Sequence, residues 1–337
     1  MIVVLKPNIS RKDERAVVKE IEKLGYRPHI MRGVEHTVIG AIGDERTHQS
    51  LETLALWPQV QRVMPVQKRY KLVSREAHKA NSRVTAGACV IGGPKFQVMA
   101  GPCSVEDERQ LMTTAHAVKK AGATVLRGGA FKPRTSPYEF QGLGQKGLKL
   151  LAKARRETGL SVITELLSEQ HAELVAEYAD IIQIGARNSQ NFQLLIAAAR
   201  TGKPVLLKRG LSMRVEEWLL AGEYVLSNNN PNLLFCERGI RTFETYTRNT
   251  LDLSTIPIIK NESHCPIIID PSQGAGRADL VACLCKGAAA MGADGLLVEV
   301  HPNPAEAWSD GAQQLTLDGF AQLMEALKPF IAAAGRE

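Results

Sequence analysis

Residues 125–137 read Val-Leu-Arg-Gly-Gly-Ala-Phe-Lys-Pro-Arg-Thr-Ser-Pro, and the rest of the chain repeats the pattern of this stretch. A short apolar run ends in Arg127 and two glycines, and Lys132-Pro-Arg-Thr135 follows. Three cations on a stiff turn after a buried strand are typical of a site that binds phosphate or carboxylate. We expect the glycines to let the backbone approach a bound group, and Pro133 to fix the direction of the turn. A solvated basic loop is the alternative interpretation.

Short apolar runs alternate with helical patterns through residues 94–337. Each run is too short for a buried helix, and most are rich in branched residues, so strands are predicted. The runs are Phe96–Ala100, Thr124–Leu126, Ser161–Thr164, Ile181–Ile184, Val205–Leu207, Leu233–Phe235, Ile267–Ile269 and Leu296–Val298. Eight strands alternating with helices indicate an α/β fold of the (β/α)₈ TIM-barrel type. A doubly wound open sheet is the alternative, but no GxGxxG motif follows an early strand.

Residues 1–70 show a different pattern. Strands are predicted at Ile2–Leu5, Pro28–Met31, Thr37–Ile42 and Val60–Val66, and helices at Arg11–Leu24 and Thr47–Leu56. The order βαββαβ indicates a small ferredoxin-like α+β domain, for which we expect a role in regulation or oligomer assembly. Residues 71–93 are expected to be an irregular linker with a short strand near Ala88–Ile91. The predicted domains are therefore 1–70, 71–93 and 94–337.

Composition excludes several classes of protein. The chain has 337 residues, of which 44% are hydrophobic and 23% charged, as in soluble globular proteins. Because no apolar run suits a signal peptide or a membrane span, a cytoplasmic protein without a membrane partner is predicted. The six cysteines form no CxxC pair and are expected to be mostly buried thiols. The net charge is +7, but the cations are spread along the chain and aromatics are scarce, so no nucleic-acid partner is predicted.

Cations follow four of the eight predicted strands. They are Arg127, Arg187, Lys208 and Arg238, after strands two, four, five and six. In a barrel of this type the chemistry lies at the C-terminal ends of the strands. Gathering like charges there is costly unless an anion compensates them. We therefore predict a site for one or two phosphorylated or carboxylated substrates.

A second group of strand-end residues has metal-binding chemistry. Cys103 follows the first strand, Glu299 ends the eighth, and Asp310 lies in the loop beyond it. A thiolate with two carboxylates suits Mn²⁺, Fe²⁺, Co²⁺ or Zn²⁺. Strand-end cysteines and acids are common, so the residues alone make this site a hypothesis.

Seven motifs together carry a resemblance to a known family. They are Ala100–Ser104, Arg127–Pro137, Gln183–Asn188, Leu207–Gly210, Cys236–Thr242, Asp270–Ser272 and Val298–Pro302. With these motifs the sequence resembles the 3-deoxy-D-arabino-heptulosonate 7-phosphate (DAHP) synthases, in their short bacterial form with an N-terminal ferredoxin-like domain. The resemblance covers nearly the whole chain, including the small first domain.

The resemblance implies condensation of phosphoenolpyruvate with erythrose 4-phosphate and water, the entry step of aromatic amino-acid synthesis through the shikimate pathway. It implies that phosphoenolpyruvate is held by Arg127, Lys132, Arg187, Lys208 and Arg238. Arg134 and Thr135 would hold the phosphate of the aldose. Lys132 would also carry a proton, since cationic neighbours would lower its pKa. A metal bound by Cys103, Glu299 and Asp310 would polarise or orient the aldehyde.

One position departs from the family pattern. The family has a histidine as fourth metal ligand where this chain has Gln273. An amide oxygen is a harder and weaker ligand than imidazole, which favours Mn²⁺ over Zn²⁺ or Fe²⁺. Three alternatives are open for the fourth ligand: the amide oxygen of Gln273, a water molecule, or a histidine from elsewhere, His301 or His264. The first two are favoured, because the family carries a histidine at position 301 without using it as a ligand.

Two other functions stay open at this point. The related 3-deoxy-octulosonate 8-phosphate synthases join the same enolpyruvate to a five-carbon sugar phosphate, but the Lys-Pro-Arg-Thr-Ser run and the N-terminal domain favour the heptulosonate enzyme. A non-catalytic anion-binding barrel is the other alternative, although Cys103, Glu299, Asp310 and all the cations remain. The resemblance also suggests feedback control by tyrosine or phenylalanine through residues 1–70, in a homotetramer.

Overall fold

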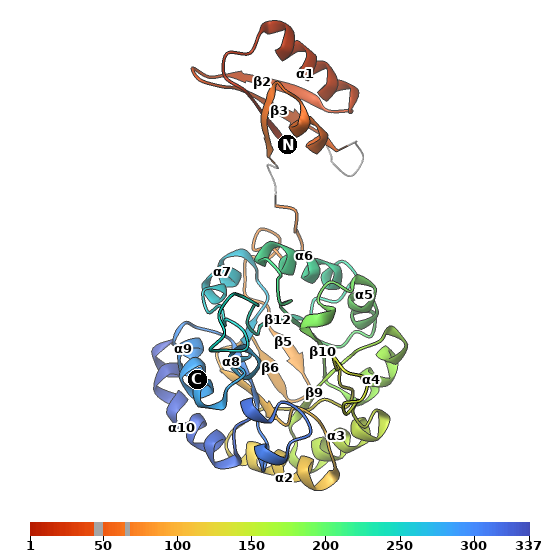
Figure 1. The fold of residues 1–337 in the computed structure, drawn as a ribbon, viewed down its shortest axis with the longest axis vertical. Coiled ribbons are helices and arrows are strands. Elements are labelled where there is room, and N and C mark those ends of the chain that lie inside the picture. Colours follow the sequence, from red (N-terminus) through yellow and green to blue (C-terminus); the bar gives the residue numbers. More distant parts are fainter. Residues whose placement is uncertain (44–49, 65–67) are drawn as a thin grey trace. The chain divides into compact units, whose positions relative to one another are not determined.

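The computed structural model describes residues 1–43, 50–64 and 68–337, and these form two compact units, Met1–Arg69 and Tyr70–Glu337 (Figure 1). None of the described helices combines the length and the apolar character that a membrane crossing requires. Five cysteines are buried free thiols, and the sixth, Cys283, is an exposed one.

The first unit is an antiparallel four-stranded sheet with the order β2-β3-β1-β4. Its elements are β1 (Ile2–Leu5), α1 (Arg11–Lys23), β2 (Arg27–Arg32), β3 (Thr37–Ile42), the 3₁₀ helix η1 (Leu51–Leu56) and β4 (Val60–Met64). Val17 and Ile21 of α1 are buried with Ile39 of β3, as the amphipathic pattern of this segment predicts. The predicted ferredoxin-like domain is confirmed. The second helix begins at Leu51 in 3₁₀ form, and positions 47–49 and 65–66 of the predicted elements lie outside the described residues.

The second unit is a closed barrel of eight parallel strands, in the order β10-β11-β12-β13-β14-β7-β8-β9. The strands are β7 (Gln97–Gly101), β8 (Val125–Arg127), β9 (Ser161–Glu165), β10 (Ile181–Ile184), β11 (Val205–Lys208), β12 (Leu233–Glu237), β13 (Ile267–Ile269) and β14 (Gly295–Glu299). The predicted barrel is confirmed, and each strand lies within two residues of its predicted bounds. Pairing of Leu296 with Val98 joins the last strand to the first and closes the ring.

Helices cover the outside of this ring (Figure 1). They are α2 (Glu108–Lys120), α3 (Gln145–Thr158), α4 (Ala172–Tyr178), α5 (Phe192–Arg200), α6 (Val215–Leu226), α7 (Thr255–Glu262), α9 (Ala278–Ala290) and α10 (Leu317–Ala333), with the short α8 (Pro271–Ala275) after β13. Four 3₁₀ helices lie in the connections: η2 (Glu169–His171), η3 (Ala186–Asn188), η4 (Pro304–Glu306) and η5 (Gly311–Gln313). In α3, Leu148, Leu151 and Ala154 are buried, so the predicted apolar face packs against the barrel.

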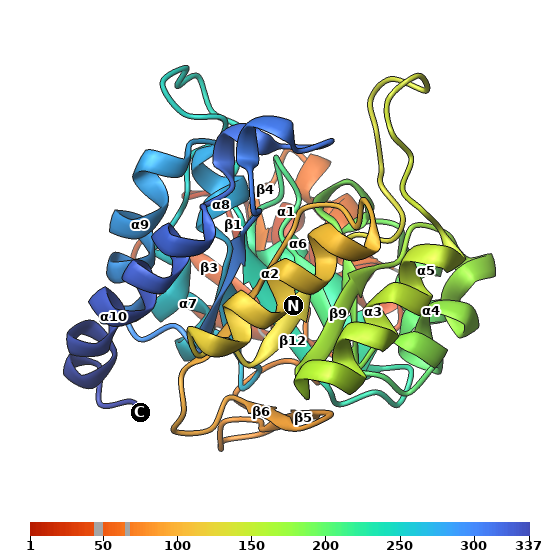
Figure 2. The same ribbon diagram turned by 90° about the horizontal axis from the view of Figure 1, so that it is seen from below.

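A hairpin covers the N-terminal end of the barrel (Figure 2). Its strands β5 (Val84–Ala86) and β6 (Cys89–Ile91) pair antiparallel. Val84 and Ile91 join the buried side chains inside the ring, such as Met99 and Val125. The prediction that residues 71–87 are irregular was wrong at β5, because a three-residue strand is too short to show a period in the sequence.

The two glycines after β8 are required by packing within the protein. A Cβ at Gly129 would lie 2.7 Å from Cδ of Lys132 and 2.9 Å from the carbonyl oxygen of Cys103. A Cβ at Gly128 would lie 3.2 Å from the side chains of Val105 and Leu151. The space beside both glycines is therefore filled by protein, which gives them a role in packing, and the approach of their backbone to a bound group stays a prediction. They let the turn after β8 pack against the turn after β7.

The contact between α6 and β12 yields a stability prediction. A Cβ at Gly222 would lie 2.7 Å from Cζ of Phe235 and 2.8 Å from Cδ2 of Leu233. Alanine gains roughly 1 kcal/mol of helix propensity over glycine, but overpacking a rigid core typically costs about 1–3 kcal/mol. We therefore expect Gly222→Ala to lower the free energy of unfolding of the barrel by up to about 2 kcal/mol in urea titrations followed by circular dichroism.

Gly287→Ala in α9 is the matched control. A Cβ at Gly287 would meet only the end of the Leu253 side chain, at 3.3 Å. This variant should be as stable as the parent chain or slightly more stable. Equal stability of the two variants would show that α6 can move away from Phe235, contrary to the prediction.

Candidate active site

A pocket opens at the C-terminal ends of the barrel strands, and its lining is strongly cationic. Of its sixteen lining residues, seven are Lys or Arg and three are Asp or Glu. The cations are Arg127, Lys132, Arg134, Arg187, Lys208, Arg238 and Arg248, and the acids are Glu139, Glu165 and Asp310. All the substrate-binding residues predicted from the sequence, Thr135 included, line this one pocket.

Two of these cations are buried in ion pairs. Arg127 at the end of β8 donates from Nη1 to Oε1 of Glu299 at 3.0 Å and to the carbonyl oxygen of Pro102 at 2.9 Å. Lys208 at the end of β11 lies 2.5 Å from Oδ2 of Asp270. Buried charges are tolerated when they are paired in this way. The pairs therefore explain how these two cations can end buried strands.

Other cationic groups have no acidic partner. Arg238 is only 5% exposed, and its guanidinium donates to the carbonyl oxygen of Gly239 and, at 3.1 Å, to Oε1 of Gln273. Within the described residues, neither Arg238 nor Arg187 forms an ion pair, and the buried Nε of Arg127 has no hydrogen-bond acceptor. Burial lowers the pKa of Arg238. Such groups are stable in a pocket that receives an anion.

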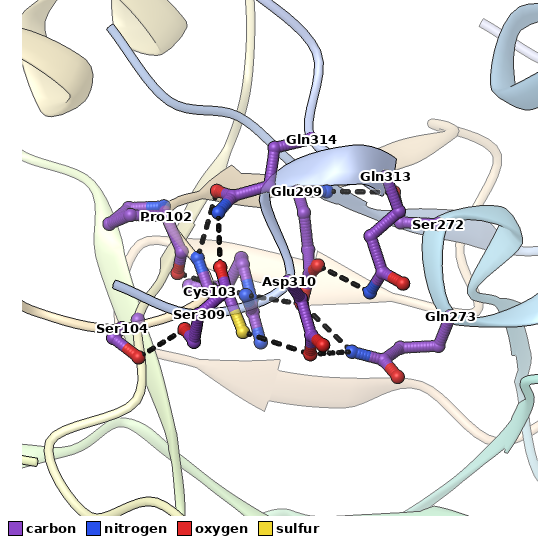
Figure 3. A network of polar contacts seen from close by, with 12 residues as sticks. Pro102, Cys103, Ser104, Ser272, Gln273, Glu299, Ser309, Asp310, Gln313 and Gln314 are labelled. Atoms are coloured by element: carbon purple, nitrogen blue, oxygen red, sulfur yellow. Dashed lines mark hydrogen bonds and ion pairs between the residues drawn. The ribbon is translucent and has the colours of Figure 1, made fainter. Parts of the chain in front are cut away.

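The predicted metal-binding residues lie together beside this pocket (Figure 3). Sγ of Cys103 and one carboxylate oxygen each of Glu299 and Asp310 lie within 4.8 Å of one another. Gln313 donates to Oε2 of Glu299 at 2.7 Å, and Gln314 accepts from the backbone N–H of Cys103 at 3.2 Å. Second-sphere hydrogen bonds of this kind orient metal ligands. Glu299 and Cys103 are thus held by two consecutive residues at the end of η5.

The charges of these donors suit a divalent cation. Burial, followed by the charge of Glu299, raises the pKa of Cys103 to about 11. For Asp310, burial favours the neutral acid, but Arg248 and Lys132 outweigh it and hold its pKa at about 2. A cation bound here would therefore meet the ionised carboxylate of Asp310 and displace the thiol proton of Cys103. A soft sulfur with two oxygens is a donor set for transition metals.

The predicted lowering of the Lys132 pKa was wrong for the chain by itself. Burial and the charge of Arg127 do favour the neutral amine, but Cys103, Glu299 and Glu165 outweigh them and raise the pKa of Lys132. Its Nζ lies 3.0 Å from Sγ of Cys103 and 3.1 Å from the carbonyl oxygen of the same residue. Lys132 is therefore an ammonium group at neutral pH.

Gln273 connects the cationic pocket to the group of acids. Its Nε2 donates to Oε1 of Glu299 at 3.1 Å and to Oδ2 of Asp310 at 3.3 Å, as Figure 3 shows. Its Oε1 accepts the hydrogen bond from Arg238. In this orientation the amide nitrogen, which is not a metal ligand, faces the acids. Turning the amide over would place its NH₂ group against the Arg238 guanidinium.

The two histidines considered at the sequence level have other partners. Nε2 of His301 lies 3.2 Å from Oε2 of Glu106, and its Nδ1 accepts from the backbone of Asn303. His264 precedes β13, at the end of the barrel away from the pocket, with Nδ1 2.7 Å from Oγ of Ser82. Neither belongs to the group formed by Cys103, Glu299 and Asp310.

Arg248 is a pocket residue that the sequence did not indicate. It donates from Nη1 to Oδ1 of Asp310 at 3.0 Å and to Oε1 of Gln313 at 3.2 Å. It lies between β12 and α7, ten residues beyond Arg238, where no strand end draws attention to it. Glu165 lies at the end of β9, so the sequence shows it as an acid at a strand end, but the residues next to it in the sequence indicate no role.

The comparisons with known proteins agree along the whole chain. A family model described as the DAHP synthetase I family matches residues 73–332, and one described as the DAHP synthase ferredoxin-like domain matches residues 1–68. Phospho-2-dehydro-3-deoxyheptonate aldolase of Thermotoga maritima is 52% identical, over 99% of this chain and 99% of that protein. Its crystal structure superposes with a TM-score of 0.94 at 51% identity, covering 100% of this chain and 98% of that one.

A related activity gives weaker matches. The 2-dehydro-3-deoxyphosphooctonate aldolase of Caulobacter vibrioides is 32% identical, over 70% of this chain and 87% of that protein. Its match covers too little of the chain to include both units, whereas the heptonate enzyme matches both. With its barrel, its small antiparallel domain and its cationic pocket, the chain belongs to the DAHP synthetase I family.

Proposed function

We propose that this chain condenses phosphoenolpyruvate with erythrose 4-phosphate and water, giving DAHP and inorganic phosphate, as the entry step of the shikimate pathway. The observation that carries the proposal is the buried guanidinium of Arg238, which lines the pocket with only neutral partners. A bound anion would supply the missing compensation. The full-length likeness to a heptonate aldolase indicates which anions these are.

Phosphoenolpyruvate would bind on the inner cations of the pocket. Its phosphate and carboxylate would be held by Arg127, Lys132, Arg187, Lys208 and Arg238. The unpaired Nε of Arg127 supplies one hydrogen-bond donor. The exposed guanidinium of Arg187 supplies two parallel N–H donors, which match two oxygens of a phosphate or carboxylate. Arg134 and Thr135, on the loop after β8, would hold the phosphate of the aldose. The two substrates would then meet between β8 and the acids.

The group of Cys103, Glu299 and Asp310 fits a divalent metal, and we propose Mn²⁺ with water as the further ligand. A metal there supplies Lewis-acid polarisation of the aldehyde carbonyl. The chain's own part is to hold the ligands: Arg248 orients Asp310 and Gln313 orients Glu299. Lys132, kept as an ammonium, would deliver a proton from Nζ to the oxygen that becomes a hydroxyl when C3 of phosphoenolpyruvate attacks.

An activity assay with a choice of aldoses tests the proposed function. We expect purified protein with Mn²⁺ to release phosphate from phosphoenolpyruvate with erythrose 4-phosphate, and to be much slower with arabinose 5-phosphate. Removing the metal with EDTA should abolish turnover, and Mn²⁺ should restore it. A preference for the pentose would contradict the assignment. Tight phosphoenolpyruvate binding without turnover would instead support a non-catalytic barrel.

Substitutions at Gln273 test how the metal site is completed. If water completes the site, Gln273→Leu should weaken Mn²⁺ binding by about tenfold, because it removes the hydrogen bonds to Glu299 and Asp310 but no ligand. Gln273→His adds an imidazole, and we expect it to tighten Zn²⁺ binding by roughly tenfold or more. Competition with a fluorescent chelator measures both values without relying on activity. A loss of Mn²⁺ affinity far beyond tenfold in Gln273→Leu would instead make the amide oxygen a ligand.

The first unit is proposed to carry feedback control by tyrosine or phenylalanine, in a homotetramer that works in the cytoplasm. Support comes from the match of residues 1–68 to the ferredoxin-like domain of this family and from the separate core of Met1–Arg69. A chain that begins at Tyr70 should keep its activity and lose inhibition by these amino acids. Light scattering of both chains reports the oligomeric state. Undiminished inhibition of the shortened chain would refute this role.

A further inference from the structure

The loop between β8 and α3 holds a pair of opposite charges on the pocket wall. Arg134 donates from Nε to Oε2 of Glu139 at 3.2 Å and from Nη2 to Oε1 at 2.8 Å. The backbone N–H of Ser136 faces Oε2 of the same carboxylate at 3.4 Å. Two parallel bonds from one guanidinium edge are also the arrangement by which arginine binds a phosphate. The Glu139 carboxylate therefore occupies the anion-binding edge of Arg134.

The two partners differ in how freely they can move. The Arg134 side chain is 17% exposed, whereas that of Glu139 is 43% exposed, although both line the pocket. Gln141 donates from Nε2 to the carbonyl oxygen of Glu139 at 2.9 Å, which holds the loop backbone. In Figure 2 this loop (yellow) extends well beyond the barrel into solvent. Glu139 can therefore turn outward by side-chain rotation while Arg134 stays in the wall.

We propose that Glu139 is a specificity-determining residue, a competitor within the chain for the subsite that takes the aldose phosphate. This inference rests on the proposed function, in which Arg134 holds that phosphate. A phosphate carries more negative charge than a carboxylate and has a third oxygen, which Thr135 can bind, so it displaces Glu139. An aldose without a phosphate has no group that does so. The ion pair thus lowers the affinity for a phosphorylated aldose, which must displace Glu139, and leaves the affinity for an unphosphorylated one unchanged.

The expected effect is modest, because exposed ion pairs are worth little in water. Releasing Arg134 from Glu139 should lower the KM for erythrose 4-phosphate by about two- to fivefold. The KM for phosphoenolpyruvate and kcat should stay unchanged, since the inner cations do not contact Glu139. Inorganic phosphate, used as a probe, should compete against erythrose 4-phosphate more strongly by a similar factor.

Glu139→Gln is the test, because the amide keeps the size of the side chain and removes its charge. Glu108→Gln is the matched control: Glu108 also forms an ion pair on the surface, with Lys153, and does not line the pocket. The control should leave both KM values unchanged. In an Arg134→Met background, Glu139→Gln should cause no further change, because its effect requires the guanidinium.

The outcomes separate this inference from the function on which it rests. A higher or unchanged KM for erythrose 4-phosphate in Glu139→Gln overturns the proposal that Glu139 competes for the subsite. A higher KM would mean that Glu139 orients Arg134 for the substrate. Arg134→Met alone should raise that KM. If Arg134→Met has no such effect, the assignment of Arg134 to the aldose phosphate fails. If the parent chain does not turn over erythrose 4-phosphate, the proposed function itself fails.

Discussion

The ion pair between Arg127 and Glu299 joins the two halves of the site. Arg127 ends β8, Glu299 ends β14, and Nη1 lies 3.0 Å from Oε1 although both side chains are almost completely buried. Nε of the same arginine has no hydrogen-bond acceptor in the described parts of the chain. Glu299 is one of the candidate metal ligands. Losing one partner of such a pair leaves an uncompensated buried charge. In the proposed function, substrate binding and metal binding therefore both depend on this one contact.

The other cations at this end of the barrel are compensated to different degrees. Lys208 has Asp270, Arg238 has only amide and carbonyl oxygens, and Arg187 has no ion pair among the described residues. The pocket therefore keeps a net positive charge after all internal pairing. A concave surface of one sign of charge raises the local concentration of opposite ions and speeds their association. This suits small dianionic substrates.

The barrel was predictable because its strands are short, branched and completely buried, a pattern that the sequence shows directly. The candidate site was predictable because a barrel brings residues at strand ends together, which applies to Arg127, Lys208, Arg238 and Glu299. Arg248 and Glu139 lie in the middle of long loops, and their positions depend on tertiary contacts that no local pattern records. The Lys132 pKa was mispredicted because the sequence indicates the nearby cations but not the distances to Cys103 and Glu299. The hairpin strand β5 was missed because three residues show no period.

Closure of the ring has a consequence for folding. Pairing of β7 with β14 brings together residues almost two hundred positions apart, such as Val98 and Leu296. Because closing so long a loop costs conformational entropy, we expect this pairing to form late in folding. Cys103 follows the first of these strands, and Glu299 ends the second. These two donors are therefore adjacent only in a completed barrel. A divalent cation that binds them stabilises the closed ring over every partly folded form of the chain, by an amount that grows with its free concentration.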